Sequence, residues 1–148
     1  MDVKGLLAEE ERGWLALTEA FGDIPPDRFD EPSVTDEGWS PKDVMHHVAA
    51  WSEEAARVLG RIAAGTHRES DPDTDALNER WFEEGRGVED DVVRSRFAKG
   101  RVAMRHVFST LTEVDADAWE WFEESGPRHY AEHLHDLRSF LERGTDRP

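Results

Sequence analysis

Apolar residues recur every three to four positions along most of the chain, which is the spacing of amphipathic helices, and no segment alternates as a half-buried strand does. This spacing predicts helices over about residues 3–21, 41–64, 73–84 and 89–112, and a last helix from 127 to just before 144. A loop is expected around Trp119 and Trp121. The inner stripe of the first helix is predicted to be Leu7, Trp14, Leu15, Thr18 and Phe21.

Four main helices and one short helix, joined by loops of moderate length, predict an all-α fold: an antiparallel four-helix bundle with one extra short helix. The chain has 148 residues, so residues 1–148 are expected to form a single domain. The clearest boundary is the start of the second helix, where Ser40 has the place of an N-cap and Pro41 that of the first helical residue. Asp43 is placed to complete a capping box.

The charge balance is strongly acidic: 34 Asp and Glu against 18 Lys and Arg give a formal net charge of −16. Such a surface repels phosphate backbones and anionic lipids, so neither nucleic acid nor a membrane is expected as a partner. The chain has no cysteine, which leaves His, Asp and Glu as the metal ligands available. The N-terminal segment is acidic and no apolar run has the length of a membrane span, so a cytoplasmic protein is expected.

Helical phase sorts the seven histidines. At about 100° per residue, His47 lies on the flank of the apolar stripe of the second helix, whereas His46 points to the opposite side. His129 and His133 lie one above the other at the edge of the apolar stripe of the last helix. The other histidines face away from the apolar stripes or lie in a loop: His67, His106 and His135. The candidates for the interior are therefore His47, His129 and His133.

A histidine pair at positions i and i+4 can hold one divalent ion, because both imidazoles project in the same direction from one helix face. Such pairs also arise by chance, so the residues alone leave two interpretations open: a metal site, or histidines at the edge of the core. Glu54, two turns after His47, and Glu132, beside His133, are candidate catalytic carboxylates for moving a proton. Packing or capping for Glu54 and a solvated helix surface for Glu132 are the alternatives.

Three segments resemble the DinB/YfiT-like superfamily of four-helix bundles. They are GWSPKDVMHHVAAWSEEAARVL in the second helix, DPDTDALNERWFEEG in the short helix and HYAEHLHDLRSFL in the last helix. The resemblance spans roughly Trp14 to Leu141, and its first and last segments are the specific ones. The last segment resembles in particular the branch related to colibactin self-resistance proteins and to the N-terminal domain of mycothiol-dependent maleylpyruvate isomerase.

The resemblance implies metal ligands at His47, His129 and His133, the residues that helical phase selects. It also implies pocket or cofactor-binding positions, each of which also suits packing or capping: Trp51, Asn78 and Tyr130. Three neutral imidazoles leave a coordination position open, as in catalytic zinc sites, and zinc or nickel is the expected ion. Similar proteins use a low-molecular-weight thiol, such as mycothiol, bacillithiol or glutathione, or an activated water.

The leading hypothesis is metal-dependent activation of a thiol or water for transfer, isomerisation or hydrolysis on a small electrophilic molecule. The alternatives are a non-enzymatic protein that sequesters a toxic small molecule, and a bundle without activity kept as a dimerisation or regulatory module. Homodimers are common in similar proteins, so a homodimer is a candidate here. Trp119 and Trp121 suit its interface, and core packing explains the two residues equally well. The acidic surface would repel an anionic thiol unless the metal and arginines such as Arg80 or Arg128 offset its field.

Overall fold

The computed structural model describes residues 2–68 and 73–145. Its helices are α1 (Val3–Gly22), α2 (Pro41–Ala64), α3 (Thr74–Gly85), α4 (Asp90–Thr110), α5 (Ala116–Ser125) and α6 (Pro127–Thr145), with a 3-10 turn at Pro26–Arg28. The described residues contain no strand, so the predicted all-α class is confirmed. Within these residues no helix combines the length and the apolar character needed to cross a membrane.

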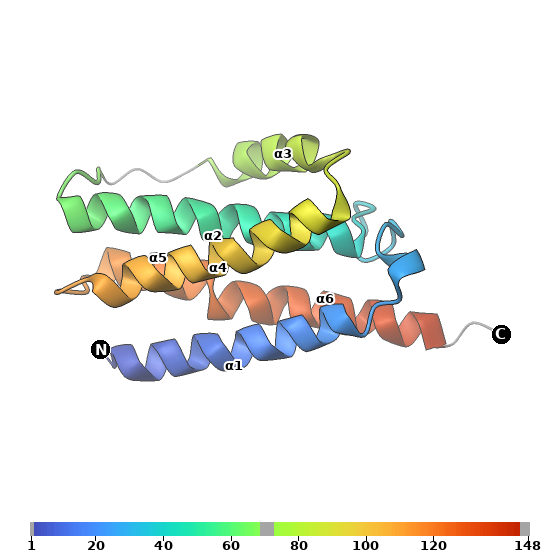
Figure 1. The fold of residues 1–148 in the computed structure, drawn as a ribbon, viewed down its shortest axis with the longest axis horizontal. Coiled ribbons are helices and arrows are strands. Elements are labelled where there is room, and N and C mark those ends of the chain that lie inside the picture. The colour runs from blue at the N-terminus through green and yellow to red at the C-terminus, as the bar shows by residue number, and fades with distance from the viewer. Residues whose placement is uncertain (1, 69–72, 146–148) are drawn as a thin grey trace.

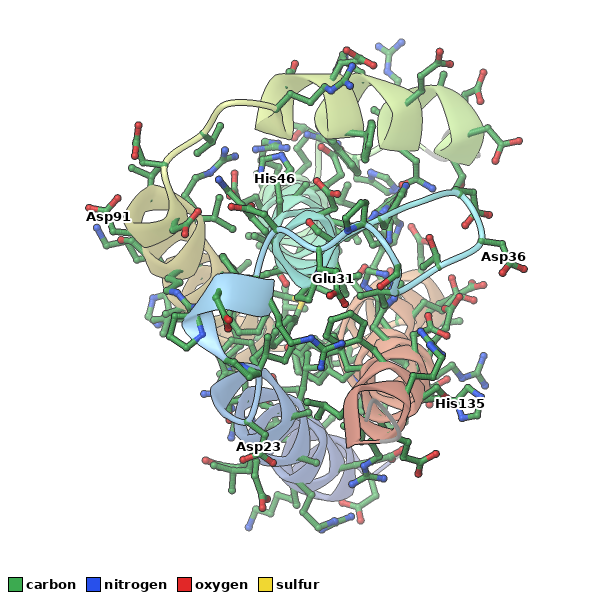
Figure 2. All side chains as sticks on the ribbon, turned by 90° about the vertical axis from the view of Figure 1, so that its right-hand side faces the viewer. Asp23, Glu31, Asp36, His46, Asp91 and His135 are labelled. Atoms are coloured by element: carbon green, nitrogen blue, oxygen red, sulfur yellow. The ribbon has the colours of Figure 1, made fainter. Side chains whose placement is uncertain are left out.

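Four helices, α1, α2, α4 and α6, surround the core, and α3 lies outside the bundle against α2 (Figure 1; end-on in Figure 2). Helices α2 and α4 run in one direction, and α1 and α6 run in the opposite direction. The expectation of an antiparallel arrangement throughout is therefore wrong. The physical reason is α3, which carries the chain back along α2, so that α4 begins at the same end of the bundle as α2. The result is a parallel pair, α2 with α4, that packs together within the bundle.

Close approach of α2 and α4 depends on a residue without a side chain. A Cβ atom at Gly100 of α4 would lie 3.2 Å from the backbone carbonyl oxygen of Ala49 in α2. That distance is tighter than an ordinary van der Waals contact, so glycine permits the two backbones to pack at this spacing. This packing holds α2, which carries one of the candidate histidines, firmly in the bundle.

The start of α2 has the capping box that its sequence predicts. The Ser40 hydroxyl accepts a hydrogen bond from the Asp43 backbone N–H at 3.1 Å, and the Asp43 carboxylate accepts one from the Ser40 N–H at 2.9 Å. The helix ends at Gly65, whose φ of +72° lies in the left-handed region that glycine adopts without strain. Both ends of the helix are thus determined by local sequence.

The predicted inner stripe of α1 is wrong in part. Leu15 is 58% exposed, because the buried face of the helix is centred on Leu6 and Leu17. Glu10 lies in the middle of that face and is itself fully buried. Because this buried face contains a carboxylate, its residues do not form a continuous apolar stripe. The apolar spacing in the sequence therefore predicted a neighbouring face of the helix as the buried one. Trp14, which was predicted to face inward, packs at the margin of the core.

Residues 116–125 form helix α5, where a loop was expected. The Asp115 carboxylate caps this helix by accepting a hydrogen bond from the Ala118 N–H at 2.8 Å. Ala118, Phe122 and Ser125 form its buried face at helical spacing. The buried face consists of three residues, and acidic residues lie between them in the sequence. This spacing is too short to predict a helix from the apolar pattern.

Candidate metal centre

Helices α2 and α6 bring together the three histidines that helical phase selects. The Nε2 atom of His47 lies 3.0 Å from the Nε2 atom of His129, which lies 3.0 Å from the Nε2 atom of His133. Each histidine offers one nitrogen, and the three nitrogens all lie within 4.8 Å of one another. Residues 82 positions apart in the chain therefore meet at one point, with their ring nitrogens converging.

The triad fits a divalent metal ion. Tetrahedral zinc with Zn–N bonds of about 2.0–2.1 Å places its nitrogen ligands roughly 3.3 Å apart, close to the two shorter separations here. All three converging atoms are Nε2, so every ring presents the same edge to the common point. Three histidine ligands leave at least one position open on such an ion, which is the arrangement of catalytic rather than structural zinc sites.

The environment keeps all three rings neutral. Burial, followed by the nearby His133 and His46 rings, lowers the pKa of His47 to about 3. Burial is also the main reason that the pKa of His129 lies well below its ordinary value. For His133, burial outweighs the opposing carboxylates of Glu132 and Asp136 and lowers the pKa. An imidazole must be neutral to bind a metal, so the site is prepared for an ion at neutral pH.

Neighbouring side chains lie against two of the rings. The Nδ1 atom of His133 lies 3.6 Å from a carboxylate oxygen of Asp136, one turn later in α6. A carboxylate behind a metal-bound imidazole fixes the orientation of the ring and increases its basicity. Trp39 packs edge-on against His47, with ring centroids 4.9 Å apart. Among the described residues, the buried Nδ1 atoms of His129 and His133 have no hydrogen-bond partner.

A cavity of about 630 Å³ lies directly against the triad, and His47 and His129 form part of its wall. Trp51 and Asn78 also line it, and the Trp51 indole N–H donates to the Asn78 side-chain oxygen at 2.8 Å. This bond joins α2 to α3 over the cavity. The volume suits a small molecule.

The five other predicted site residues have different positions. Trp51, Asn78 and Glu132 line the cavity. Glu54 does not line it, and its carboxylate pairs with Arg57 at 2.8 Å. Tyr130 is fully buried on the other side of α6, where its hydroxyl donates to the Glu10 carboxylate at 2.9 Å. The described contacts therefore give Tyr130 a place in the core and bring it to neither the triad nor the cavity.

His46 and His135 lie away from the triad, as their helical phase predicts. His46 is located between α2 and α3, and its Nε2 atom donates to the Trp81 backbone carbonyl at 3.0 Å (Figure 2). Although it faces away from the bundle core, His46 is only 5% exposed, because α3 covers it. His135 projects outward from α6.

Sequence reasoning missed the part of the cavity wall that α5 supplies. The residues involved are Asp117, Glu120, Trp121 and Glu124. Their spacing of three, four and seven positions places them on one helix face, a signal that becomes visible once the segment is recognised as helical. His67, assigned to a loop, also lines the cavity, and its Nε2 atom lies 2.9 Å from an Asp117 carboxylate oxygen.

The sequence profile of the mycothiol maleylpyruvate isomerase N-terminal domain matches residues 10–143. The chain belongs to this DinB-like family. The match includes all three histidines of the triad. The resemblance to the DinB/YfiT-like superfamily is confirmed, and a search of curated proteins finds no significant match.

Solved structures share the fold of this family member. The mycothiol-dependent maleylpyruvate isomerase superposes with a TM-score of 0.75 at 16% identity, covering 93% of this chain and 61% of that chain. A histidine-to-alanine variant of that isomerase gives a TM-score of 0.75 at 15% identity. An uncharacterised protein from Escherichia coli UTI89 gives a TM-score of 0.78 at 12% identity, covering 95% of this chain and 92% of that one. The chain thus spans about three-fifths of the isomerase's length.

Proposed function

We propose that this chain is a divalent-metal-dependent protein that activates a small thiol for attack on a small electrophilic molecule, by transfer or isomerisation. The observation that carries the proposal is the convergence of three neutral Nε2 atoms at the wall of a cavity of about 630 Å³. Membership of a family described by a mycothiol-dependent isomerase supports the thiol. Zinc or nickel is the proposed ion, because imidazole donors suit both, and mycothiol or bacillithiol is the proposed class of thiol.

In this proposal the residues of the chain hold and orient the reactants. His47, His129 and His133 would hold the divalent ion, which would supply the positive charge that lowers the pKa of a thiol or water at the open side of the site. The Asp136 carboxylate, 3.6 Å from the His133 Nδ1 atom, is the group proposed to orient this ring once the ion is bound. Trp39 packs on the His47 ring and keeps water from that side of the triad.

Of the two candidate carboxylates, Glu132 is the one proposed to accept the proton of the thiol. It lines the cavity and is exposed to it, whereas the Glu54 carboxylate is paired with Arg57 outside the cavity wall. The proposal requires neither nucleic acid nor a membrane, which agrees with the net charge of −16. A cytoplasmic location and a homodimer stay predictions.

Metal content and thiol turnover test the proposal together. We expect purified protein to contain roughly one equivalent of zinc or nickel by elemental analysis, as a three-histidine site requires. We also expect it to consume thiol repeatedly with chlorodinitrobenzene as the electrophile. His133→Ala should lose both the metal and the turnover. His135→Ala, a substitution on the exposed face of the same helix, should keep both.

The time course separates catalysis from sequestration. Repeated turnover beyond one equivalent supports an enzyme, whereas a stoichiometric burst with no further reaction identifies a sequestering protein. A wild-type protein that binds neither zinc nor nickel contradicts the proposal, as does a His133→Ala variant with unchanged metal content.

A further inference from the structure

The charge of the cavity wall indicates which class of small molecule it accepts. Four lining residues carry carboxylates: Asp117, Glu120, Glu124 and Glu132. The described lining residues include no Lys or Arg. A cavity lined by one sign of charge concentrates ligands of the opposite sign, because its low-dielectric walls focus the field.

The two arginines that the sequence suggests as offsets for this charge, Arg80 and Arg128, pair with other residues. Arg128 pairs with Glu123 at 3.2 Å and Arg80 lies 3.6 Å from Glu84, and neither arginine lines the cavity. The structure therefore brings neither of these two arginines to the cavity, where either could offset the acidic field. Asp117 has a partner in His67, whose Nε2 atom lies 2.9 Å from an Asp117 carboxylate oxygen, which leaves Glu120, Glu124 and Glu132 as the other carboxylates of the wall.

Three of the four carboxylates lie on one face of α5, with Phe122 buried on the other. Burial, and then the neighbouring Glu120, raise the pKa of Glu124. Like charges at positions i and i+4 repel one another, so this arrangement costs stability in the free protein. A cation between these side chains would relieve the repulsion.

Aromatic rings supply a second feature that suits a cation. Trp51 and Trp121 line the cavity with ring centroids 6.4 Å apart and an angle of 37° between their planes. The Trp51 indole N–H is already occupied by Asn78, so Trp51 offers its ring rather than a hydrogen bond. Trp81 packs edge-on against Trp51 with centroids 4.9 Å apart and holds it in place. Tryptophan faces attract organic cations through the ring quadrupole.

We propose that the electrophilic substrate which this cavity selects is a small organic cation, a molecule with an ammonium group on an apolar body, in preference to a carboxylate of similar size. The ammonium group lies between the α5 carboxylates and the two tryptophan faces, and the rest of the molecule extends toward the histidine triad. The inference rests on the proposed function only in treating this cavity as the substrate site. The isomerase that shares the fold is named for a pyruvate, an anion, and the wall described here disfavours that class.

Three probes of similar shape test the assignment: choline, its uncharged isostere dimethylbutanol, and dimethylbutanoate. Binding to chelator-treated protein is measured by calorimetry at low ionic strength, so that no metal contributes. We expect choline to bind at least about tenfold more tightly than dimethylbutanol, from cation–π and carboxylate attraction together. Dimethylbutanoate should bind more weakly than either. Equal affinities for choline and dimethylbutanol, or tighter binding of the anion, overturn the proposal.

A charge-matched pair of variants distinguishes the cavity from the acidic surface as a whole. Replacing Glu120 and Glu124 together by Gln should raise the Kd for choline by about fivefold or more while leaving dimethylbutanol nearly unchanged. Replacing Glu9 and Glu19, exposed on α1, together by Gln removes the same charge and should change the Kd by less than about twofold. An equal loss in both double variants overturns the proposal, because it assigns the preference to the net charge.

Zinc binding by the same proteins keeps this inference separate from the proposed function. A wild-type protein that prefers choline but binds no divalent metal supports the cation site and contradicts the proposed function. A protein that binds zinc at the triad but shows no preference for choline contradicts the cation site alone.

Discussion

Two clusters of buried polar side chains share helix α6, and they differ in how completely their atoms are paired. In one cluster, the Glu10 carboxylate accepts hydrogen bonds from Arg101 at 2.7 and 2.9 Å, from Arg105 at 2.8 Å and from the Tyr130 hydroxyl at 2.9 Å. In the other, the histidine triad, three nitrogens converge on one point and the Nδ1 atom of His129 has no partner among the described residues.

The difference separates a cluster that stabilises the fold from the cluster to which we assign the proposed function. A buried charge whose oxygens are all hydrogen-bonded joins the helices that supply its partners, here α1, α4 and α6. Nitrogens that converge without enough donors between them lack hydrogen-bond partners, and the divalent ion of the proposed function would satisfy them. Burial and the Glu10 carboxylate raise the pKa of Tyr130 well above its usual value, so the phenol keeps its proton for that hydrogen bond.

Glu10→Ala should have the largest effect, on folding alone. It leaves two partly buried guanidinium groups without their carboxylate, and breaking a buried ion pair in this way costs about 3–5 kcal/mol. Urea unfolding measures the loss. Glu11→Ala, at an exposed neighbour that lies 3.8 Å from Arg105, should cost less than about 1 kcal/mol. Similar losses in the two variants would show that the paired cluster does not stabilise the fold.

His129→Ala should have the next largest effect, and only in the presence of metal. A ligand at 100 times its Kd stabilises a folded protein by about 2.7 kcal/mol, so zinc should raise the unfolding free energy of the wild type by this amount. The variant should gain nothing from zinc, because it lacks the central member of the triad. The measurement is urea unfolding with and without zinc, and an equal gain in wild type and variant would place the zinc elsewhere.

Asp136→Asn should weaken zinc binding without changing the fold. A carboxylate behind a ligating imidazole contributes about 10–100-fold in affinity, and the 3.6 Å separation here favours the lower end, about tenfold. Competition with a chromogenic chelator measures the affinity. Arg138→Gln, on an exposed position of the same helix, serves as the control and should leave the affinity unchanged. Unchanged zinc affinity in Asp136→Asn would remove this residue from the site.

Tyr130→Phe should have the smallest effect. It removes one hydrogen bond to Glu10 and keeps the ring, which costs about 1 kcal/mol of folding stability. Zinc affinity should stay the same, because Tyr130 belongs to the fully paired cluster even though it follows His129 in the sequence. Unfolding and the chelator competition measure the two quantities on one sample. A loss of zinc affinity without a loss of stability would reverse the assignment of Tyr130.

Much of the histidine site could be predicted from sequence because it depends on local geometry. The phase of α2 follows from its capping box and apolar stripe, and that phase alone turns His47 toward the bundle. The four-residue interval between His129 and His133 places both rings on one face of α6. The cavity wall on α5 could not be predicted in the same way. The buried face of that helix is too short for the spacing of its apolar residues to indicate a helix.

The sequence by itself determined where most helices begin and end and which histidines face inward, because capping and helical phase act over only a few residues. The tertiary structure alone decided that α2 and α4 run parallel, that Glu10 is buried among arginines, and that four carboxylates surround one cavity. These features depend on contacts between residues far apart in the chain. No local pattern encodes such contacts, because each requires the helices to be packed first.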